Sequence, residues 1–227
     1  MIPVQKRLQF LVVTMMMLFL VVANLAPALA AAPGMVGPSP GTPIWVTTTG
    51  GEVNSSPAVE KGVVYVGSAD NSVYALDATT GQILWQTITG GAVDSSPIVE
   101  KGVVYVGSGD GKVYALDAAT GLPIWVTATG GAVHSSPTVD KSGVLYIGSG
   151  DSKVYALDTA TGLPIWVTAT GGAVDSSPTV EKSGVLYVGS DDGSVYALVA
   201  ATGAVLWQTI TGGAVDSSPA VDKSGVL

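Results

Sequence analysis

The chain has 227 residues and a formal net charge of −8, from 9 Lys and Arg against 17 Asp and Glu. This negative balance repels nucleic acid and anionic lipid headgroups, so neither is an expected partner. Cysteine is absent, which excludes disulfides, thiolate zinc sites, iron–sulfur clusters and a cysteine nucleophile. Charged residues make up 11% and hydrophobic ones 47%, with 30 glycines. This composition excludes a disordered chain and a coiled coil, and it favours an all-β fold.

The first thirty residues have the layout of an export signal. Lys6 and Arg7 precede a long apolar run, and small residues follow it around Ala30. Residues 1–30 are therefore predicted to be a signal peptide cleaved near Ala30, which leaves an extracytoplasmic chain that is not inserted in a membrane. An uncleaved anchor is the alternative, because the uncharged stretch is long enough to span a bilayer. Residues 31–42 are predicted to form a Pro/Gly linker.

A repeat marked by tryptophan organises the rest of the chain. Five tryptophans are spaced by 40, 40, 41 and 41 residues, namely Trp45, Trp85, Trp125, Trp166 and Trp207. This is the period of a β-propeller blade. The expected fold is an all-β propeller of four-stranded blades over residues 43–227, with four complete blades and partial ones. The blades are predicted at about 52–90, 91–130, 131–171 and 172–212, with a partial blade at 213–227.

Each repeat contains four short runs rich in β-branched and aromatic residues, which the second repeat illustrates. Its strands are predicted at 96–99, 103–106, 112–116 and 123–127. The runs are continuously apolar rather than alternating, which indicates that both faces of each sheet are covered by neighbouring blades. The dipeptide at 110–111, Asp-Gly, predicts a tight hairpin between the second and third strands.

The turn between the third and fourth strands carries a recurrent motif. In the first repeat Asp77 can cap the turn, Gly81 can adopt a positive φ, and the following Trp85 can pack over it. Ala75 to Trp85 resembles the tryptophan-docking motif, A-x-D-x-x-T-G-x-x-x-W, of the pyrroloquinoline-quinone-like (PQQ-like) β-propeller repeat family. Val199 replaces the aspartate in the fourth copy, which removes that cap. The docking residues are Asp77, Thr80, Gly81, Trp85, Asp117, Thr120, Gly121, Trp125, Asp158, Thr161, Gly162, Trp166 and Trp207.

The resemblance covers residues 43–227 and implies a fold rather than an activity. Members of the family usually have seven or eight blades. An isolated fourth strand at 43–47 and the partial last blade still lack one strand for five-blade closure, so a fragment of a larger ring is expected. Open edges would favour self-association. The family's quinoprotein dehydrogenases hold PQQ with adjacent cysteines, an arginine and a calcium site. The predicted mature chain has neither Cys nor Arg, which argues against PQQ and against an enzyme.

No catalytic residue is predicted. His134 is the only histidine, and because it occupies a repeat position held elsewhere by Asn or Asp, a loop substitution is the simplest interpretation. A Ser-Ser-Pro triplet recurs in every repeat. Recurrence indicates a structural role, since one active site needs one nucleophile. The first serines of the triplets are Ser55, Ser95, Ser135, Ser176 and Ser217.

Strand direction predicts that the inter-blade loops and the hairpins between second and third strands lie on one face, which we call the upper face. Two sets of polar residues lie on it. The inner set is Asn54, Asp94, His134, Asp175 and Asp216. The outer set is Asp70, Asp110, Asp151 and Asp192. Asp94, Asp175 and Asp216 are candidate ligands for Ca²⁺. The alternative is that all these aspartates serve turn geometry and solubility.

The function predicted from these observations is that of an exported, non-enzymatic propeller. It would act as a binding platform or scaffold for a protein or a surface glycan, through the upper face or through exposed strand edges. Two alternatives stay open: a Ca²⁺-binding module, and part of a quinoprotein dehydrogenase.

Overall fold

The computed structural model describes residues 42–221. The predicted signal peptide and all of the predicted linker except Thr42 lie outside the described residues. Sixteen β-strands make up the regular secondary structure of this part of the chain. Between residues 42 and 221 there is no helix of the length and hydropathy that crossing a membrane requires.

The strands form four separate sheets, one for each repeat. The first contains β1 (Ala58–Glu60), β2 (Val63–Ser68), β3 (Ser72–Asp77) and β4 (Ile83–Ile88). The second contains β5 (Ile98–Glu100), β6 (Val103–Ser108), β7 (Lys112–Asp117) and β8 (Pro123–Ala128). The third contains β9 (Thr138–Val139), β10 (Val144–Ser149), β11 (Lys153–Asp158) and β12 (Pro164–Ala169). The fourth contains β13 (Thr179–Val180), β14 (Val185–Ser190), β15 (Ser194–Val199) and β16 (Val205–Ile210).

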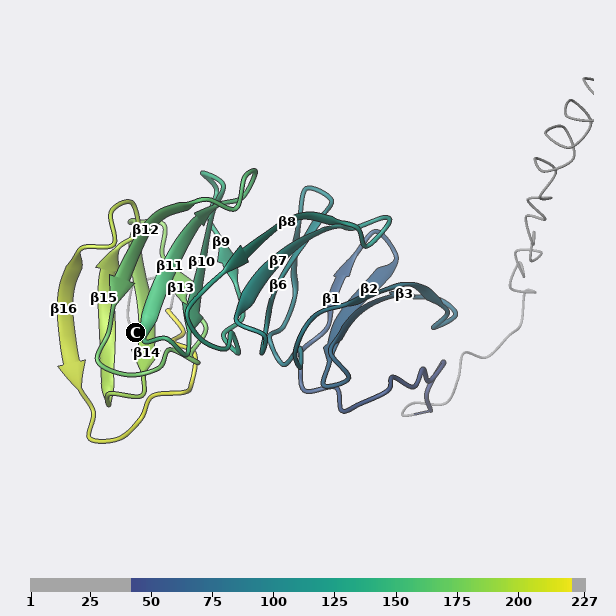
Figure 1. Ribbon diagram of the computed structural model, residues 1–227, viewed down its shortest axis with the longest axis horizontal. Coiled ribbons are helices and arrows are strands. Elements are labelled where there is room, and N and C mark those ends of the chain that lie inside the picture. The colour runs from purple at the N-terminus through teal and green to yellow at the C-terminus, as the bar shows by residue number, and fades with distance from the viewer. Residues whose placement is uncertain (1–41, 222–227) are drawn as a thin grey trace, which may run out of the picture. The chain divides into compact units, whose positions relative to one another are not determined.

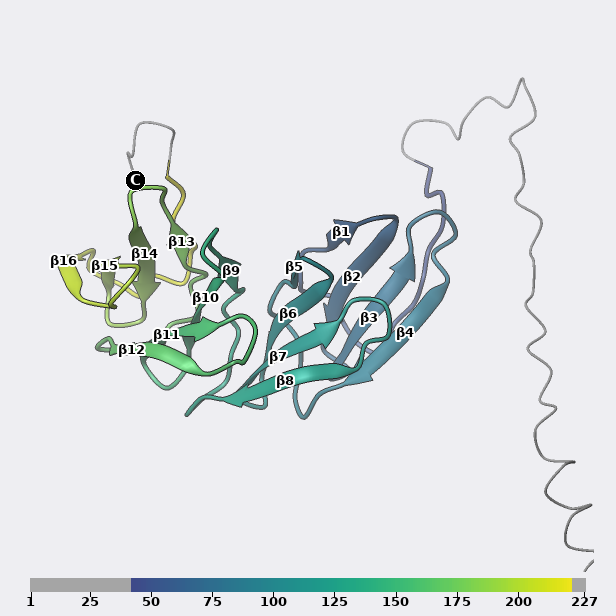
Figure 2. The ribbon, with the colours of Figure 1, turned by 90° about the horizontal axis from the view of Figure 1, so that it is seen from above.

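Within each sheet the strands lie in chain order and are antiparallel, so every connection is a hairpin. The first strand is short, with two or three residues, and the other three have six. The sheets succeed one another in chain order (Figure 1). From above, β1, β5, β9 and β13 gather on one side, while β4, β8 and β12 lie on the other (Figure 2). This is the blade arrangement of a propeller, and the predicted all-β fold is confirmed.

The hydrophobic core consists of layers between successive sheets. One layer joins Tyr65, Val73 and Ala75 of the first sheet to Val104 and Leu116 of the second. Equivalent layers join the second sheet to the third and the third to the fourth. Because each inner sheet is covered on both faces, its second and third strands are buried almost throughout, which explains the continuous apolar runs.

Tight hairpins connect the second and third strands, as the Asp-Gly pair in the second repeat predicts. Gly111 has φ of 80° there, and Asn71, Ser152 and Gly193 take left-handed φ values of 68°, 65° and 80° at the equivalent positions. Glycine and asparagine tolerate this conformation, whereas serine carries a steric cost. The third and fourth strands pair with a register shift, which in the second sheet falls between Ala115 and Leu116.

The expected strand at residues 43–47 is not formed. This segment has no regular secondary structure and pairs with no strand in the described part of the chain. Ile44 and Val46 are each 77% exposed. The physical reason is that a blade's fourth strand pairs only with the third strand of its own sheet, and residues 42–221 contain no third strand for this segment.

Candidate functional site

The turn between the third and fourth strands is capped by its aspartate. Oδ1 of Asp117 accepts hydrogen bonds from the N–H groups of Thr120 (2.8 Å) and Ala119 (3.2 Å) and from the Thr120 hydroxyl (2.7 Å). The side-chain and backbone hydrogen bonds of Thr120 hold the pKa of the Asp117 carboxyl below its ordinary value. Asp77 and Asp158 make the same contacts in the first and third repeats.

Each turn is covered by a tryptophan from the preceding repeat. Nε1 of Trp85 donates to the carbonyl of Ala118 (3.0 Å), and Oγ1 of Thr87 donates to the carbonyl of Gly121 (2.6 Å). A Cβ on Gly121 would lie 2.7 Å from the Trp85 ring. The prediction that Trp85 packs over the turn of its own repeat is therefore wrong: the turn at Gly81 is covered by Trp45, and Trp85 covers the turn of the next blade. The sequence does not indicate this contact, because Trp85 and Ala118 are 33 positions apart and meet only when the two sheets pack together.

The same contact occurs four times, with indole donors from Trp45, Trp85, Trp125 and Trp166. Trp207 packs beside Tyr187, with ring centroids 5.8 Å apart, but it faces no further turn within residues 42–221 and is 41% exposed. The turn that carries Val199 keeps its backbone bonds without the aspartate, since the N–H of Gly203 donates to the Val199 carbonyl at 2.8 Å.

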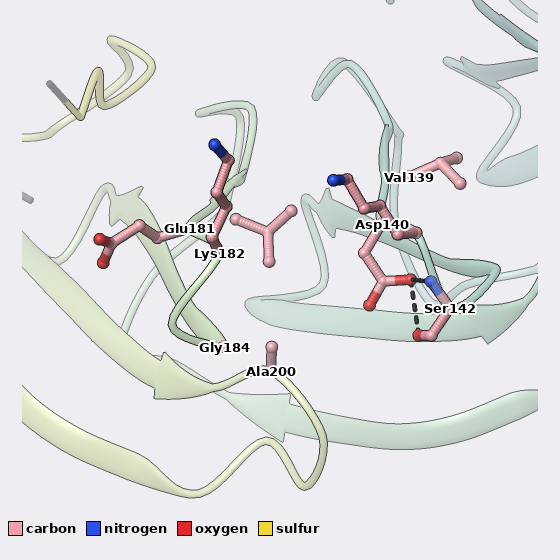
Figure 3. A pocket seen from close by; sticks show the side chains of 9 residues that line it. Val139, Asp140, Ser142, Glu181, Lys182, Gly184 and Ala200 are labelled. Atoms are coloured by element: carbon pink, nitrogen blue, oxygen red, sulfur yellow. Dashed lines mark hydrogen bonds between the residues drawn. The ribbon is translucent and has the colours of Figure 1, made fainter. Parts of the chain in front are cut away.

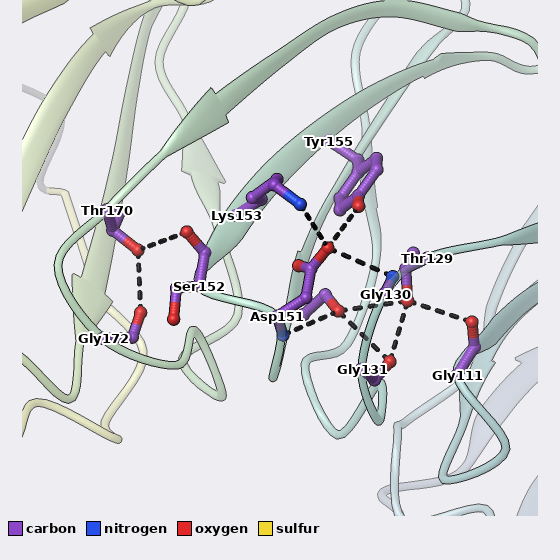
Figure 4. A network of polar contacts seen from close by, with 11 residues as sticks. Gly111, Thr129, Gly130, Gly131, Asp151, Ser152, Lys153, Tyr155, Thr170 and Gly172 are labelled. Atoms are coloured by element: carbon purple, nitrogen blue, oxygen red, sulfur yellow. Dashed lines mark hydrogen bonds and ion pairs between the residues drawn. The ribbon is translucent and has the colours of Figure 1, made fainter.

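The outer aspartates of the upper face tie loops to hairpins. Oδ2 of Asp151 accepts from the hydroxyl of Tyr155 (2.6 Å), from Nζ of Lys153 (2.9 Å) and from the N–H of Gly130 in the inter-blade loop (3.1 Å) (Figure 4). The side chain is 7% exposed. Burial raises the pKa of Asp151, but the hydrogen bonds from Tyr155 and Lys153 outweigh burial and leave the pKa below its ordinary value. Asp70, Asp110 and Asp192 accept the equivalent hydrogen bonds from a tyrosine hydroxyl and from a glycine N–H of the inter-blade loop.

The inter-blade loop also contacts the blade behind it. Oγ1 of Thr129 shares its single proton between the carbonyls of Gly111 (2.9 Å) and Gly131 (2.8 Å), while the N–H of Gly130 donates to Asp151 of the following hairpin (Figure 4). Loops and hairpins therefore share one face, as predicted from strand direction. Oδ2 of each outer aspartate is engaged in these contacts, whereas Oδ1 of Asp70, Asp151 and Asp192 is buried without a hydrogen-bond partner.

The inner set of polar residues is divided into two groups. In the first, Nδ2 of Asn54 donates to Oδ1 of Asp94 at 3.1 Å, and Nδ1 of His134 lies 3.6 Å from Oδ2 of Asp94. His134 thus faces a carboxylate of the neighbouring repeat. The serines that precede the triplet prolines, from Ser96 to Ser218, each accept a hydrogen bond from the backbone of the preceding repeat.

The second group lies around Asp191, a hairpin residue that the sequence analysis did not single out. The pKa of Asp191 is raised, first by desolvation and then by a hydrogen bond to Asp216 and by the charges of Asp216 and Asp175. Its signal in the sequence is that small residues hold this position in the other repeats. Even so, no set of three or more Asp, Glu, His or Cys in residues 42–221 is arranged to hold a metal ion.

The Ser-Ser-Pro triplets have two structural tasks. The first serine is buried in the first four triplets, and Oγ of Ser135 accepts from the N–H of Gly148 on the second strand of its blade (3.0 Å). The second serine links adjacent blades, since the N–H of Ser96 donates to Oγ of Ser136 at 2.8 Å. The ladder continues through Ser56, Ser96, Ser136, Ser177 and Ser218. Recurrence in the sequence indicated a structural role but not this contact between blades.

The outer strand of each sheet exposes apolar side chains along an unpaired edge. β8 pairs only with β7, and Ile124 and Val126 are 50% and 42% exposed. In β12, Ile165 and Val167 are 49% and 43% exposed. None of the outer strands β4, β8, β12 and β16 contains a charged residue. Charge is the usual protection of an edge strand, so these edges are open to another strand.

A pocket of about 540 Å³ lies on the opposite, lower face between the third and fourth sheets (Figure 3). Val139, Val180 and Ala200 supply its apolar lining, and Lys141 and Lys182 flank it. Asp140 is also part of the lining, but its Oδ1 is occupied by the N–H and hydroxyl of Ser142. Ser142, Glu181 and Gly184 complete the lining.

Comparison with known proteins is consistent with this geometry. BamB from Moraxella catarrhalis superposes with a TM-score of 0.68 and 22% identity, over 77% of this chain and 57% of that one. A quinohemoprotein alcohol dehydrogenase from Comamonas testosteroni gives 0.64 and 24%, over 73% and 36%. The computationally designed Ika4 protein gives 0.63 and 20%, over 70% and 98%. A search of curated protein sequences finds no match.

The chain therefore spans little more than half of the BamB chain and about a third of the dehydrogenase chain. At these identities the likeness shows the fold. A family model described as outer membrane protein assembly factor BamB matches residues 28–125, 74–172 and 150–227. Together these matches cover most of the sequence, and the chain belongs to this family of PQQ-like β-propeller repeat proteins.

Proposed function

We propose that this chain is an exported, non-enzymatic scaffold that binds protein segments by strand addition along its outer strands. The observation that carries the proposal is the uncharged, unpaired edge of β4, β8, β12 and β16, with apolar side chains exposed along each. An extended peptide laid against such an edge gains main-chain hydrogen bonds, and its alternate side chains contact the apolar row. The family description, outer membrane protein assembly, fits a ligand that is itself a protein.

The non-enzymatic part of the proposal has separate support. The recurring serines are engaged in structural hydrogen bonds, and His134 pairs with a single carboxylate. These 227 residues contain no Cys, and their single arginine, Arg7, lies in the predicted signal peptide, so they do not supply the groups that the family's dehydrogenases use to hold the quinone. Calcium binding by Asp94, Asp175 and Asp216 stays a prediction, to be tested by the melting temperature with and without millimolar Ca²⁺; an unchanged temperature contradicts it.

A labelled peptide of alternating valine and threonine is a suitable probe for strand addition. The full chain is titrated with the peptide by calorimetry, and up to four peptides should bind, one on each outer strand. The variant with Ile124→Lys and Ile165→Lys places charge on two of the four edges. Because lysine on an edge strand opposes pairing, the number of bound peptides should fall by half.

The matched control carries the same added charge outside the strands. Leu122 and Leu163 are 67% and 66% exposed and precede β8 and β12. Leu122→Lys with Leu163→Lys should leave peptide binding unchanged. Equal loss in both variants would show that charge alone controls binding, and an unchanged stoichiometry in the first variant would refute strand addition.

A further inference from the structure

Each complete repeat places one lysine at the turn between its first and second strands, on the lower face. These residues are Lys61, Lys101, Lys141 and Lys182. In the first repeat, Nζ of Lys61 lies 3.5 Å from Oε1 of Glu60. In the second, Nζ of Lys101 lies 3.6 Å from Oε1 of Glu100. The lysines of the third and fourth turns form no ion pair in the described part of the chain, so their charges are not balanced in the same way.

An inserted serine accounts for this difference. The third and fourth turns are one residue longer than the first two, and the additional residue is a serine. Oδ1 of Asp140 accepts hydrogen bonds from the N–H (2.9 Å) and the hydroxyl (2.7 Å) of Ser142. Oε2 of Glu181 accepts from the hydroxyl of Ser183 at 2.7 Å. Each carboxylate is bound to its serine rather than to the lysine that follows it, which leaves two ammonium groups without a counter-ion within residues 42–221.

Lys141 and Lys182, the two lysines without a counter-ion, flank the pocket between the third and fourth sheets, which we call the lysine pocket. The carboxylate of Glu181 points away from its opening (Figure 3). Three small aliphatic side chains form the apolar part of the lining, as described above. The lysine pocket therefore combines an apolar surface with two positive charges at its rim.

Asp140 also lines the lysine pocket, but its charge is already compensated. The N–H of Val144 donates to Oδ1 at 2.9 Å, and the hydroxyl of Tyr146 donates to Oδ2 at 3.0 Å. The N–H and the hydroxyl of Ser142 are two further donors. Because these donors stabilise the carboxylate in place, it does not need either lysine as a partner.

A second departure from the repeat removes negative charge beside the same pocket. The equivalent pocket between the first and second sheets, of about 440 Å³, is lined by two carboxylates, Glu60 and Asp117. Val199 holds the position of Asp117 in the fourth repeat. It lines a hollow of about 440 Å³ that adjoins the lysine pocket and shares Ala200 with it. Trp166 lines this hollow too, so the apolar surface continues beyond the lysine pocket.

We propose that the lysine pocket binds a carboxylate that carries an aliphatic body. The carboxylate accepts hydrogen bonds from the ammonium groups of Lys141 and Lys182, and charge-assisted bonds of this kind are the strong ones. The aliphatic body contacts the apolar lining and extends toward Val199, where it is removed from water. The residues that line the lysine pocket belong to no outer strand, so this inference does not rest on strand addition.

The experiment is calorimetric titration of the full chain with sodium octanoate. A ligand of this size should bind with a dissociation constant of about 0.1–1 mM. Acetate lacks the aliphatic body and 1-octanol lacks the charge, so each should bind at least about tenfold more weakly than octanoate. Absence of octanoate binding at millimolar concentration overturns the proposal, and so does octanol that binds as tightly as octanoate.

Two pairs of lysine substitutions locate the site. Lys141→Gln with Lys182→Gln should raise the dissociation constant of octanoate about tenfold or more, because both charged donors are lost. Lys61→Gln with Lys101→Gln makes the same change of net charge at the equivalent turns, where each lysine already has a carboxylate partner. This control should stay within about twofold of the wild type. An equal loss of affinity in the two variants would assign binding to overall charge and not to the lysine pocket.

Val199 provides a test in which the fold is not weakened. Val199→Asp restores the carboxylate that caps the other turns and brings negative charge next to the ligand, so the dissociation constant should rise about fivefold. Val199→Asn has nearly the same shape without the charge and should change the constant by no more than about twofold. Circular dichroism checks that all variants are folded. If the aspartate and asparagine variants lose affinity equally, charge beside the pocket does not govern binding and the proposal is wrong.

Discussion

Replacing Gly121 by alanine tests the contact that joins one blade to the next. Gly121 has φ of 71°, a conformation that costs an L-residue about 1–2 kcal/mol. The added Cβ would also lie 2.7 Å from the Trp85 ring and 2.8 Å from Oγ1 of Thr87. Overpacking of this kind costs about 1–3 kcal/mol. The free energy of unfolding should therefore fall by about 2–5 kcal/mol in total.

Gly102→Ala separates the two contributions. Gly102 lies in the same blade with φ of 80°, and a Cβ there would meet nothing within 4 Å. This variant should lose only the backbone cost of about 1–2 kcal/mol. Urea titrations followed by circular dichroism measure both variants, and the difference between them reports the contact with Trp85.

Measuring Gly121→Ala in a Trp85→Ala background tests directly whether the indole causes the added cost. With Trp85→Ala already present, the methyl group of Gly121→Ala no longer meets the indole and only the contact with Oγ1 of Thr87 remains, so its cost should fall toward that of Gly102→Ala. If Gly121→Ala and Gly102→Ala cost the same in the wild-type background, the indole does not restrict this glycine, and the account of blade docking is wrong.

Three further predictions concern single turns and side chains. Ser152→Gly should raise the free energy of unfolding by about 0.5–1 kcal/mol, because Ser152 has φ of 65° and glycine adopts this conformation without strain; a thermal or urea scan that shows no gain would contradict this. Val199→Asp should raise the urea midpoint at neutral pH by restoring the missing cap, and the gain should vanish as the pH falls through the folded-state pKa, since the other capping aspartates have lowered pKa values. Desolvation, and then the hydrogen bond to Asp110, raise the pKa of Tyr114 to about 12. The contribution of Tyr114 to stability is therefore full below pH 10 and is lost as the pH rises toward 12. In Asp110→Asn the tyrosinate absorbance of Tyr114 should titrate nearer the ordinary tyrosine pKa, and an unchanged titration would refute the contribution of this carboxylate.

Much of the fold could be predicted because it depends on local sequence patterns that recur in every repeat. The spacing of the tryptophans sets the length of a blade, and the hairpin at Asp110 and Gly111 depends only on adjacent residues. The capping of the turn at Asp117 is likewise a contact over three positions. The continuous apolar runs indicated sheets covered on both faces, which the layers between blades confirm.

Contacts between blades could not be predicted in the same way. The hydrogen bond from Trp85 to Ala118 joins residues 33 positions apart, and each bond of the serine ladder joins residues 40 or 41 positions apart. Repetition itself conceals such contacts, because every repeat offers an identical partner and the sequence does not say which one is used. The packing of one sheet on the next decides it, since only that packing brings the indole of one repeat over the turn of another.

The need for a neighbouring sheet also explains why residues 43–47 form no strand and why Trp207 is exposed. Their sequences are those of a blade's fourth strand, and sequence alone determined that they carry the docking residues. Whether such a segment becomes a strand, and whether its tryptophan is buried, depends on a neighbouring sheet. Hydrogen bonds between strands and apolar contacts between blades are made by pairs of elements, so only the tertiary structure decided which positions are filled and which are left open.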